Sequence, residues 1–177
     1  ESIEDLLKSA KLIVGNKEIE INGDALSRLK DGFQELVRST YPNLKMLNDH
    51  PNYQETDLNR YLFDDTKDLF TSGGITEFTE AEEDIITVLA QKDTSGERTT
   101  FKDISDYFMT KPYGWPLNTV QCLLAQLYRK GKIEILFEGI VLEDHRVNEL
   151  LPQIARASSL ILRPLEDIDP TKLKKLK

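Results

Sequence analysis

Residues that bind phosphate are present in this sequence, but their spacing matches no nucleotide-binding loop. A Walker-type loop needs two glycines five apart followed by Lys and Ser or Thr, so that backbone amides and the Lys surround the phosphates. None of the nine glycines begins that pattern, and Gly73-Gly74 is followed by Ile75 and Thr76. A dinucleotide-binding GxGxxG is also missing. We therefore expect these residues to bind no nucleotide and no other cofactor.

Metal-ligating residue types are present, but they do not form a ligand set. His50 and His145 are far apart, and Glu149, four positions after His145, would be only a second ligand. Four aspartates cluster near one predicted helix: Asp57, Asp64, Asp65 and Asp68. Carboxylates at helical spacing can hold a cation, yet a solvated acidic face is the more common outcome and the interpretation that we favour. We expect no metal site.

Cys122 is the single cysteine, so no disulfide can form within the chain. It lies beside the apolar stripe of a predicted helix, and a nucleophile would need a neighbouring base and an orienting acid. We expect a packed thiol and no catalytic residue. A single thiol suits a reducing compartment, and there is neither a secretory signal nor an apolar run long enough to cross a membrane. We therefore expect a cytoplasmic protein without membrane contact.

The charge distribution points to one candidate surface for nucleic acid. The net charge of -8 disfavours a protein whose whole surface grips phosphate. From Met109 to Ile133, however, there is no Asp or Glu, although the chain has 31 of them. The predicted DNA contacts in this region are its basic residues and the polar face of one helix: Lys111, Asn118, Thr119, Gln121, Arg129, Lys130 and Lys132. A helix that contacts protein also loses charge, and basic residues favour helix C-termini for dipole reasons, so both alternatives stay open.

The elements that would position these residues follow one another in a recognisable order. Thr79 and Glu82 have capping-box spacing before a helix to about residue 91. A short strand over 98–101, a helix over 102–109, a tight turn and a helix over 117–130 follow, and Gly131 ends that last helix. Two apolar runs over 133–142 predict a hairpin. Three helices followed by a β-hairpin wing define a winged helix; the alternative is an α+β domain with the same elements packed differently.

The flanking segments complete a mainly helical α+β prediction. Upstream, helices are predicted over 2–13, 25–40 and 57–70, with a strand over 17–21 and a loop over 42–53. From this pattern we predict three regions: an N-terminal helical region over 1–74, the winged helix over 75–145, and a helical extension with a basic tail over 146–177. The chain begins at Glu1, inside an amphipathic pattern, so we interpret it as a piece of a longer protein.

The run Lys111-Pro112-Tyr113-Gly114-Trp115-Pro116, followed by the helix, Gly131 and an Ile-rich strand, resembles a known segment. It is similar to the PYGWP-type segment of the large P-loop ATPases of BREX phage-defence systems, the BrxC/PglY-type proteins. Tyr41-Pro42-Asn43-Leu44 is similar to that family too. The resemblance implies a piece of a defence ATPase that acts with partner proteins, including a methyltransferase, and whose ATPase motifs lie elsewhere. It carries over Tyr113, Gly114, Trp115 and Pro116 as a structural turn. By residue type alone, Tyr113 and Trp115 could be a base-stacking pair, but aromatic residues at such a turn more often form core wedges, which is the interpretation that we favour.

Two hypotheses of function follow. In the first, a non-catalytic winged-helix region of a BREX-type ATPase contacts double-stranded DNA or positions the ATPase on it. In the second, the region is a docking or oligomerisation module that binds other BREX proteins or a second copy, which suits its acidic charge. A free-standing hydrolase is disfavoured, because no convergent polar triad or metal set is present.

Overall fold

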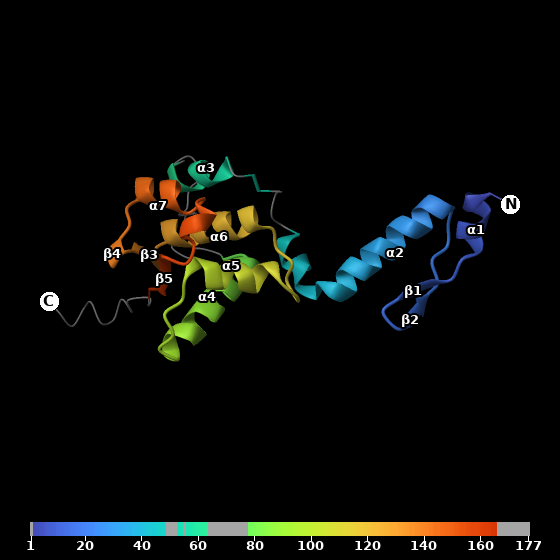
Figure 1. Ribbon diagram of the computed structural model, residues 1–177, viewed down its shortest axis with the longest axis horizontal. Coiled ribbons are helices and arrows are strands. Elements are labelled where there is room, and N and C mark those ends of the chain that lie inside the picture. The colour runs from blue at the N-terminus through green and yellow to red at the C-terminus, as the bar shows by residue number, and fades with distance from the viewer. Residues whose placement is uncertain (1, 49–52, 55, 64–77, 166–177) are drawn as a thin grey trace.

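The computed structural model describes residues 2–48, 53, 54, 56–63 and 78–165, and it is a mainly helical α+β fold, as predicted. One part is a body of helices with a three-stranded sheet at its edge (Figure 1). A smaller N-terminal part extends from the body along a single long helix. None of the described helices combines the length and apolar composition that a membrane crossing requires.

The body has the winged-helix order of elements. Its three helices are α4 (Glu80–Thr94), α5 (Phe101–Met109) and α6 (Leu117–Arg129), and the wing is formed by β3 (Ile133–Phe137) and β4 (Ile140–Val141). The predicted capping box at Thr79 and Glu82 is confirmed, and Thr100 with Asp103 forms a second one before α5. The strand predicted before α5 is reduced to one bridge between Thr100 and Ile161.

After the wing, α7 (Asp144–Leu150) and the 3-10 helix η2 (Ile154–Arg156) lead into β5 (Leu160–Pro164). The sheet order is β4-β3-β5, with both pairs antiparallel. The helix α7 agrees with the predicted helical extension, but Leu160 to Pro164, which falls in the same predicted extension, is a strand. Leu160 and Leu162 alternate inward with period 2 and are buried against the body, which a strand beside β3 allows. The basic tail predicted after residue 165 lies outside the described residues.

The N-terminal part contains α1 (Ile3–Ser9), the hairpin β1 (Leu12–Val14) and β2 (Lys17–Ile19), and α2 (Ala25–Thr40). The strand predicted from Lys17 and the helix capped by Asp24 are confirmed. The helix predicted over 2–13 is too long, because Leu12–Val14 pairs with Lys17–Ile19 around Gly15, whose φ is 60°. Apolar and β-branched residues favour such a paired strand.

Two short helices connect α2 to the body. The 3-10 helix η1 (Pro42–Leu47) replaces part of the predicted loop, and α3 (Asp57–Phe63) follows. Of the helix predicted over 57–70, residues 64–70 lie outside the described residues, as does the predicted boundary between residues 74 and 75. Leu58 and Leu62 of α3 are buried in the same core as the winged helix. The position of α3 therefore affects how much of helix α6, the third helix of the winged helix, is exposed.

Candidate functional site

Helix α6, the candidate recognition helix, lies at the centre of the body. It contacts α4, α5 and β3, and α3 packs against it as well (Figure 1). From Leu117 to Lys130 every residue is buried or half-buried, so the helix has no exposed residue. A helix that enters the major groove needs an exposed face with several side chains that reach base edges. As folded, α6 offers no such face.

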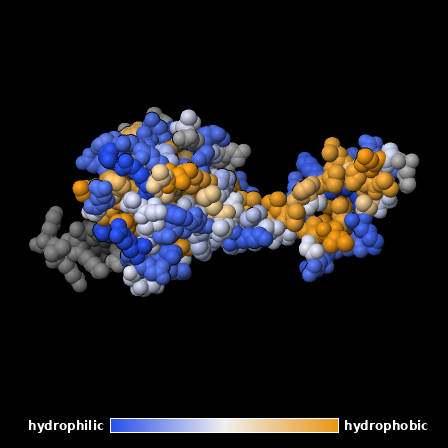
Figure 2. Space-filling model, in the orientation of Figure 1, coloured by the Kyte–Doolittle hydropathy of each residue, from blue (hydrophilic) through white to orange (hydrophobic). Residues whose placement is uncertain are grey.

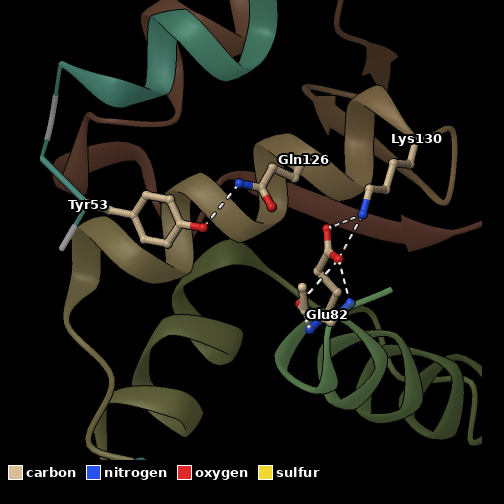
Figure 3. A network of polar contacts seen from close by, with 5 residues as sticks. Tyr53, Glu82, Gln126 and Lys130 are labelled. Carbon is tan, nitrogen blue, oxygen red and sulfur yellow. Dashed lines mark hydrogen bonds and ion pairs between the residues drawn. The ribbon is translucent and has the colours of Figure 1, made fainter. Parts of the chain in front are cut away.

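The polar side chains of α6 point to protein partners. Gln121 is 4% exposed, and its Nε2 donates to the backbone oxygen of Leu151 at 3.0 Å. Gln126 donates from Nε2 to the hydroxyl of Tyr53 at 3.2 Å (Figure 3). Thr119 is 5% exposed. Neither Thr119 nor Gln121 presents a hydrogen-bonding group to solvent, so DNA contact by these two residues stays a prediction that would require a rearrangement of the body.

Asn118 and Lys111, two further predicted contacts, lie nearer the surface. Asn118 is half-buried at the start of α6, whereas Lys111 is exposed in the turn before it. These two positions are separated by the buried Tyr113 and Trp115. One exposed lysine and one half-buried asparagine offer a small contact area. A strong DNA binder makes about six to ten phosphate contacts, many more than these two residues can supply.

The basic residues at the end of α6 have acidic partners from other elements. The Lys130 ammonium lies 2.7 and 2.8 Å from the two carboxylate oxygens of Glu82, a fully buried residue of α4 (Figure 3). Arg129 pairs with Asp144 of α7 at 3.1 Å. Lys132 lies 5.3 Å from the ring centroid of Phe78. Lys130 and Arg129, in a stretch that lacks acids in the sequence, are therefore paired with acids from distant segments, which no local pattern reveals.

The turn before α6 belongs to the core. Trp115 is 1% exposed and stacks on Phe108 with a centroid separation of 4.6 Å and an interplanar angle of 12°. Its Nε1 donates to the backbone oxygen of Asn43 at 3.2 Å, and Tyr113 packs edge-on to the same two rings. Gly114 has φ 66°, and a Cβ there would lie 2.5 Å from the ring of Tyr41. The turn thus joins the end of α2 to the body, and Pro116 follows it as the N-cap of α6.

The wing exposes apolar residues with acidic neighbours, a feature that sequence reasoning missed. Ile140 is 70% and Val141 47% exposed, although the two are consecutive in β4. Glu138 at the turn is exposed, and the side chain of Glu143 is 86% exposed. Successive side chains of a strand point to opposite faces, so two consecutive apolar residues in an outer strand place at least one apolar side chain towards solvent. The pair Ile140-Val141 was the signal in the sequence that could have indicated this exposed apolar surface.

The residues considered for metal binding or catalysis do not converge. No group of three or more His, Cys, Asp and Glu gathers anywhere in the part of the chain that the structure describes. Glu149 pairs with Arg146, whereas His145 lies 3.9 Å from Glu143. His50, Asp64, Asp65 and Asp68 lie outside the described residues. Cys122 is buried, and this burial raises the pKa of its thiol to about 12, far from the value of an activated nucleophile.

A family model described as the winged helix-turn-helix domain of the BREX ATP-binding protein BrxC matches residues 43–160. The chain belongs to this BrxC family. The resemblance inferred from the PYGWP segment is thereby confirmed. No solved structure matches the chain. The matched residues of the BrxC model begin in η1, include α3 and extend to β5, whereas most of the N-terminal part lies before them.

Proposed function

We propose that the winged-helix domain of this BrxC-family chain is a protein-docking module that binds another BREX protein through its wing. The enclosure of α6 carries this proposal: no residue of the recognition helix is exposed, whereas both residues of strand β4 in the wing are. In this role the chain supplies binding only. It contributes no bond-breaking step and binds no nucleotide itself.

The chemistry of the wing defines the partner. Ile140 and Val141 offer an exposed apolar contact, and Glu138 and Glu143 surround it with negative charge. A partner surface with a small apolar pocket and a basic rim complements this arrangement, because complementary charge speeds encounter and fixes register. The same carboxylates would repel a DNA backbone, which carries one negative charge for every 1.7 Å or so of duplex.

The proposal is tested with the purified 177-residue chain and the individually purified BREX proteins of its own locus. Isothermal titration of each pair should show one of these proteins binding. Ile140→Asp should weaken that binding about 30-fold or more, because a carboxylate would enter the apolar centre of the contact. The matched control is Ile154→Asp, which makes the same kind of change at a residue of η2 that is 66% exposed and should leave partner binding unchanged.

A parallel titration with duplex DNA at about 50 and 200 mM salt separates the two hypotheses of function. We expect no binding at either salt concentration. Duplex binding that falls steeply with salt and survives Ile140→Asp would overturn the docking proposal in favour of DNA contact. A BREX protein that binds equally well to wild type and Ile140→Asp would also overturn it, since the wing would then not be the contact.

A further inference from the structure

The N-terminal part presents an apolar surface that its own fold does not cover. Figure 2 shows apolar surface continuing over α1, the hairpin and α2 on the face in view. Seven large apolar side chains of this part are exposed, by between 41% and 77%: Ile3, Leu6, Ile13, Leu26, Phe33, Leu36 and Val37. We call these seven residues the N-terminal apolar face. Monomeric proteins rarely expose so many apolar side chains together unless the surface binds something.

The spacing along α2 is that of a helix-pairing seam. Leu26, Leu29, Phe33 and Leu36 follow one another at intervals of three, four and three residues. Alternation of three and four places side chains on one stripe that faces a partner helix, as in the a and d positions of a coiled coil. The charged residues of α2 lie outside this stripe. A helix that only packs on its own hairpin would not need three such residues exposed.

A groove runs beside this seam. It lies between β1 and α2 and has a volume of about 160 Å³, with Ile13, Gly32 and Phe33 among its lining residues. Strand β1 lies close to α2 at Gly32, where an added Cβ would lie 3.7 Å from the side chain of Leu12. An apolar hollow of roughly 150 Å³ accommodates a benzene ring. Phe33, which is 65% exposed, is an aromatic ring at the edge of this groove.

We infer that the N-terminal apolar face binds a second copy of this chain across a two-fold axis close to Phe33. In a two-fold interface each copy gives what it receives, so a ring beside its own groove can enter the partner's groove while the partner's ring enters its own. The inference goes beyond the proposed docking by the wing, since it uses a different surface and a different partner.

The charge of this part suits self-association. Residues 3–40 contain seven acidic and six basic side chains. The acidic ones are Glu4, Asp5, Glu18, Glu20, Asp24, Asp31 and Glu35, and the basic ones are Lys8, Lys11, Lys17, Arg28, Lys30 and Arg38. The segment therefore carries a net charge of -1, whereas the whole chain carries -8. Two copies can therefore meet here with little net electrostatic repulsion.

The area is also of the right order for a homodimer. Full burial of an aliphatic side chain contributes about 1.5–3 kcal/mol. At about 25 cal/mol per Å², this free energy corresponds to roughly 60–120 Å² of apolar area for each side chain. Seven side chains that are on average about 60% exposed then offer roughly 250–500 Å² per copy. Since about 65% of a homodimer interface is apolar, the total buried area would be roughly 800–1,500 Å², which reaches the range of specific interfaces.

Sedimentation equilibrium of the 177-residue chain over a range of concentrations tests the inference. We expect the mass to rise to twice the chain mass of 20.3 kDa and to stop there. Phe33→Glu should weaken dimerisation about 30-fold or more, because charge would enter the centre of the interface, while Phe33→Leu should retain it. Phe33 is 65% exposed, so circular dichroism should show both variants folded.

Ile154→Glu is the matched control, because Ile154 is 66% exposed but lies on η2 of the body. Its dimerisation should equal that of wild type. A chain that stays monomeric, a mass that grows beyond the dimer, or a dimer that survives Phe33→Glu would each overturn the inference. Ile140→Asp should dimerise normally, so failure of wing docking and failure of self-association are distinguishable.

Discussion

The ion pair between Glu82 and Lys130 offers a sharp test of how the body is held together. Glu82 has no exposed surface and the Lys130 side chain is 11% exposed, so both charges are largely removed from water. Lys130→Met removes the ammonium but keeps a side chain of similar length. The Glu82 carboxylate would retain its contacts with Thr79, at 2.9 Å from the backbone nitrogen and 3.2 Å from the hydroxyl, but it would lose its counter-charge.

The expected magnitude follows from the burial. Removing one partner of a buried ion pair costs about 3–5 kcal/mol of unfolding free energy, because the other charge stays buried without compensation. Since Lys130 retains some exposure and Glu82 retains its cap contacts, we expect about 3 kcal/mol. At 2–4 °C per kcal/mol for a chain of this size, the melting temperature should fall by roughly 6–12 °C. Thermal and urea unfolding followed by circular dichroism measure both quantities.

Two comparisons decide whether burial is the cause. Lys92→Met breaks the pair with Glu97, whose side chains are 32% and 59% exposed, and it should cost less than about 1 kcal/mol. In Glu82→Gln/Lys130→Met no buried charge remains, so the double variant should be more stable than Lys130→Met alone. If Lys130→Met unfolds within about 1 kcal/mol of wild type, or the double variant is the less stable of the two, the reasoning is refuted.

Three further predictions concern the core around the turn and α6. Trp115→Ala should cost about 3–5 kcal/mol in urea unfolding followed by circular dichroism, and Trp115→Phe clearly less, because Phe can still stack on Phe108; equal losses would contradict this packing role. Gly114→Ala should lower the unfolding free energy by more than about 2 kcal/mol, because alanine is strained in the left-handed conformation and its Cβ would collide with Tyr41. In a Tyr41→Ala background only the strain remains, so the loss should be about 1 kcal/mol; the same loss in both backgrounds would exclude the collision. Burial raises the pKa of Cys122 from 9.0 to about 12, so the thiol ionises at a lower pH in the unfolded chain than in the folded one. The stability that depends on the neutral thiol is therefore complete below pH 9.0 and is lost as the pH rises towards 12. Unfolding free energy should therefore fall above pH 9.0, and less so in Cys122→Ala; the same decline in Cys122→Ala would rule out this cause.

Local chemistry made much of the fold predictable. Thr79 with Glu82 marked the start of α4, and Asp24 marked that of α2, because caps act through backbone groups within three residues. The order of helices and the hairpin followed from periodicity. By contrast, β5 was missed, because its three apolar residues are too short a run to separate strand from helix before the partner strand is known.

The candidate site was less predictable, because its character depends on contacts between distant residues. Gln121 reads as a surface residue from its type, yet it is satisfied inside the body by a carbonyl 30 positions later. Lys130 reads as a free cation, yet its carboxylate partner lies 48 positions earlier in the chain. Hydrophobic periodicity identifies which face of a helix is apolar, but it does not show whether the polar face is covered by another helix.

The cover on α6 also bears on the choice between the two hypotheses of function. Exposing α6 to a DNA groove would require α3 to leave, and Leu58 and Leu62 of α3 are 3% and 0% exposed. Returning two such leucines to water costs roughly 3–6 kcal/mol, at about 1.5–3 kcal/mol each. Non-specific DNA binding with a Kd of about 10⁻⁴–10⁻⁶ M corresponds to only about 5.5–8.2 kcal/mol. Opening would therefore consume between about a third and all of the available binding energy and weaken the apparent affinity by a factor of about 10²–10⁴. Docking through the wing requires no such opening, because Ile140 and Val141 are exposed in the folded state.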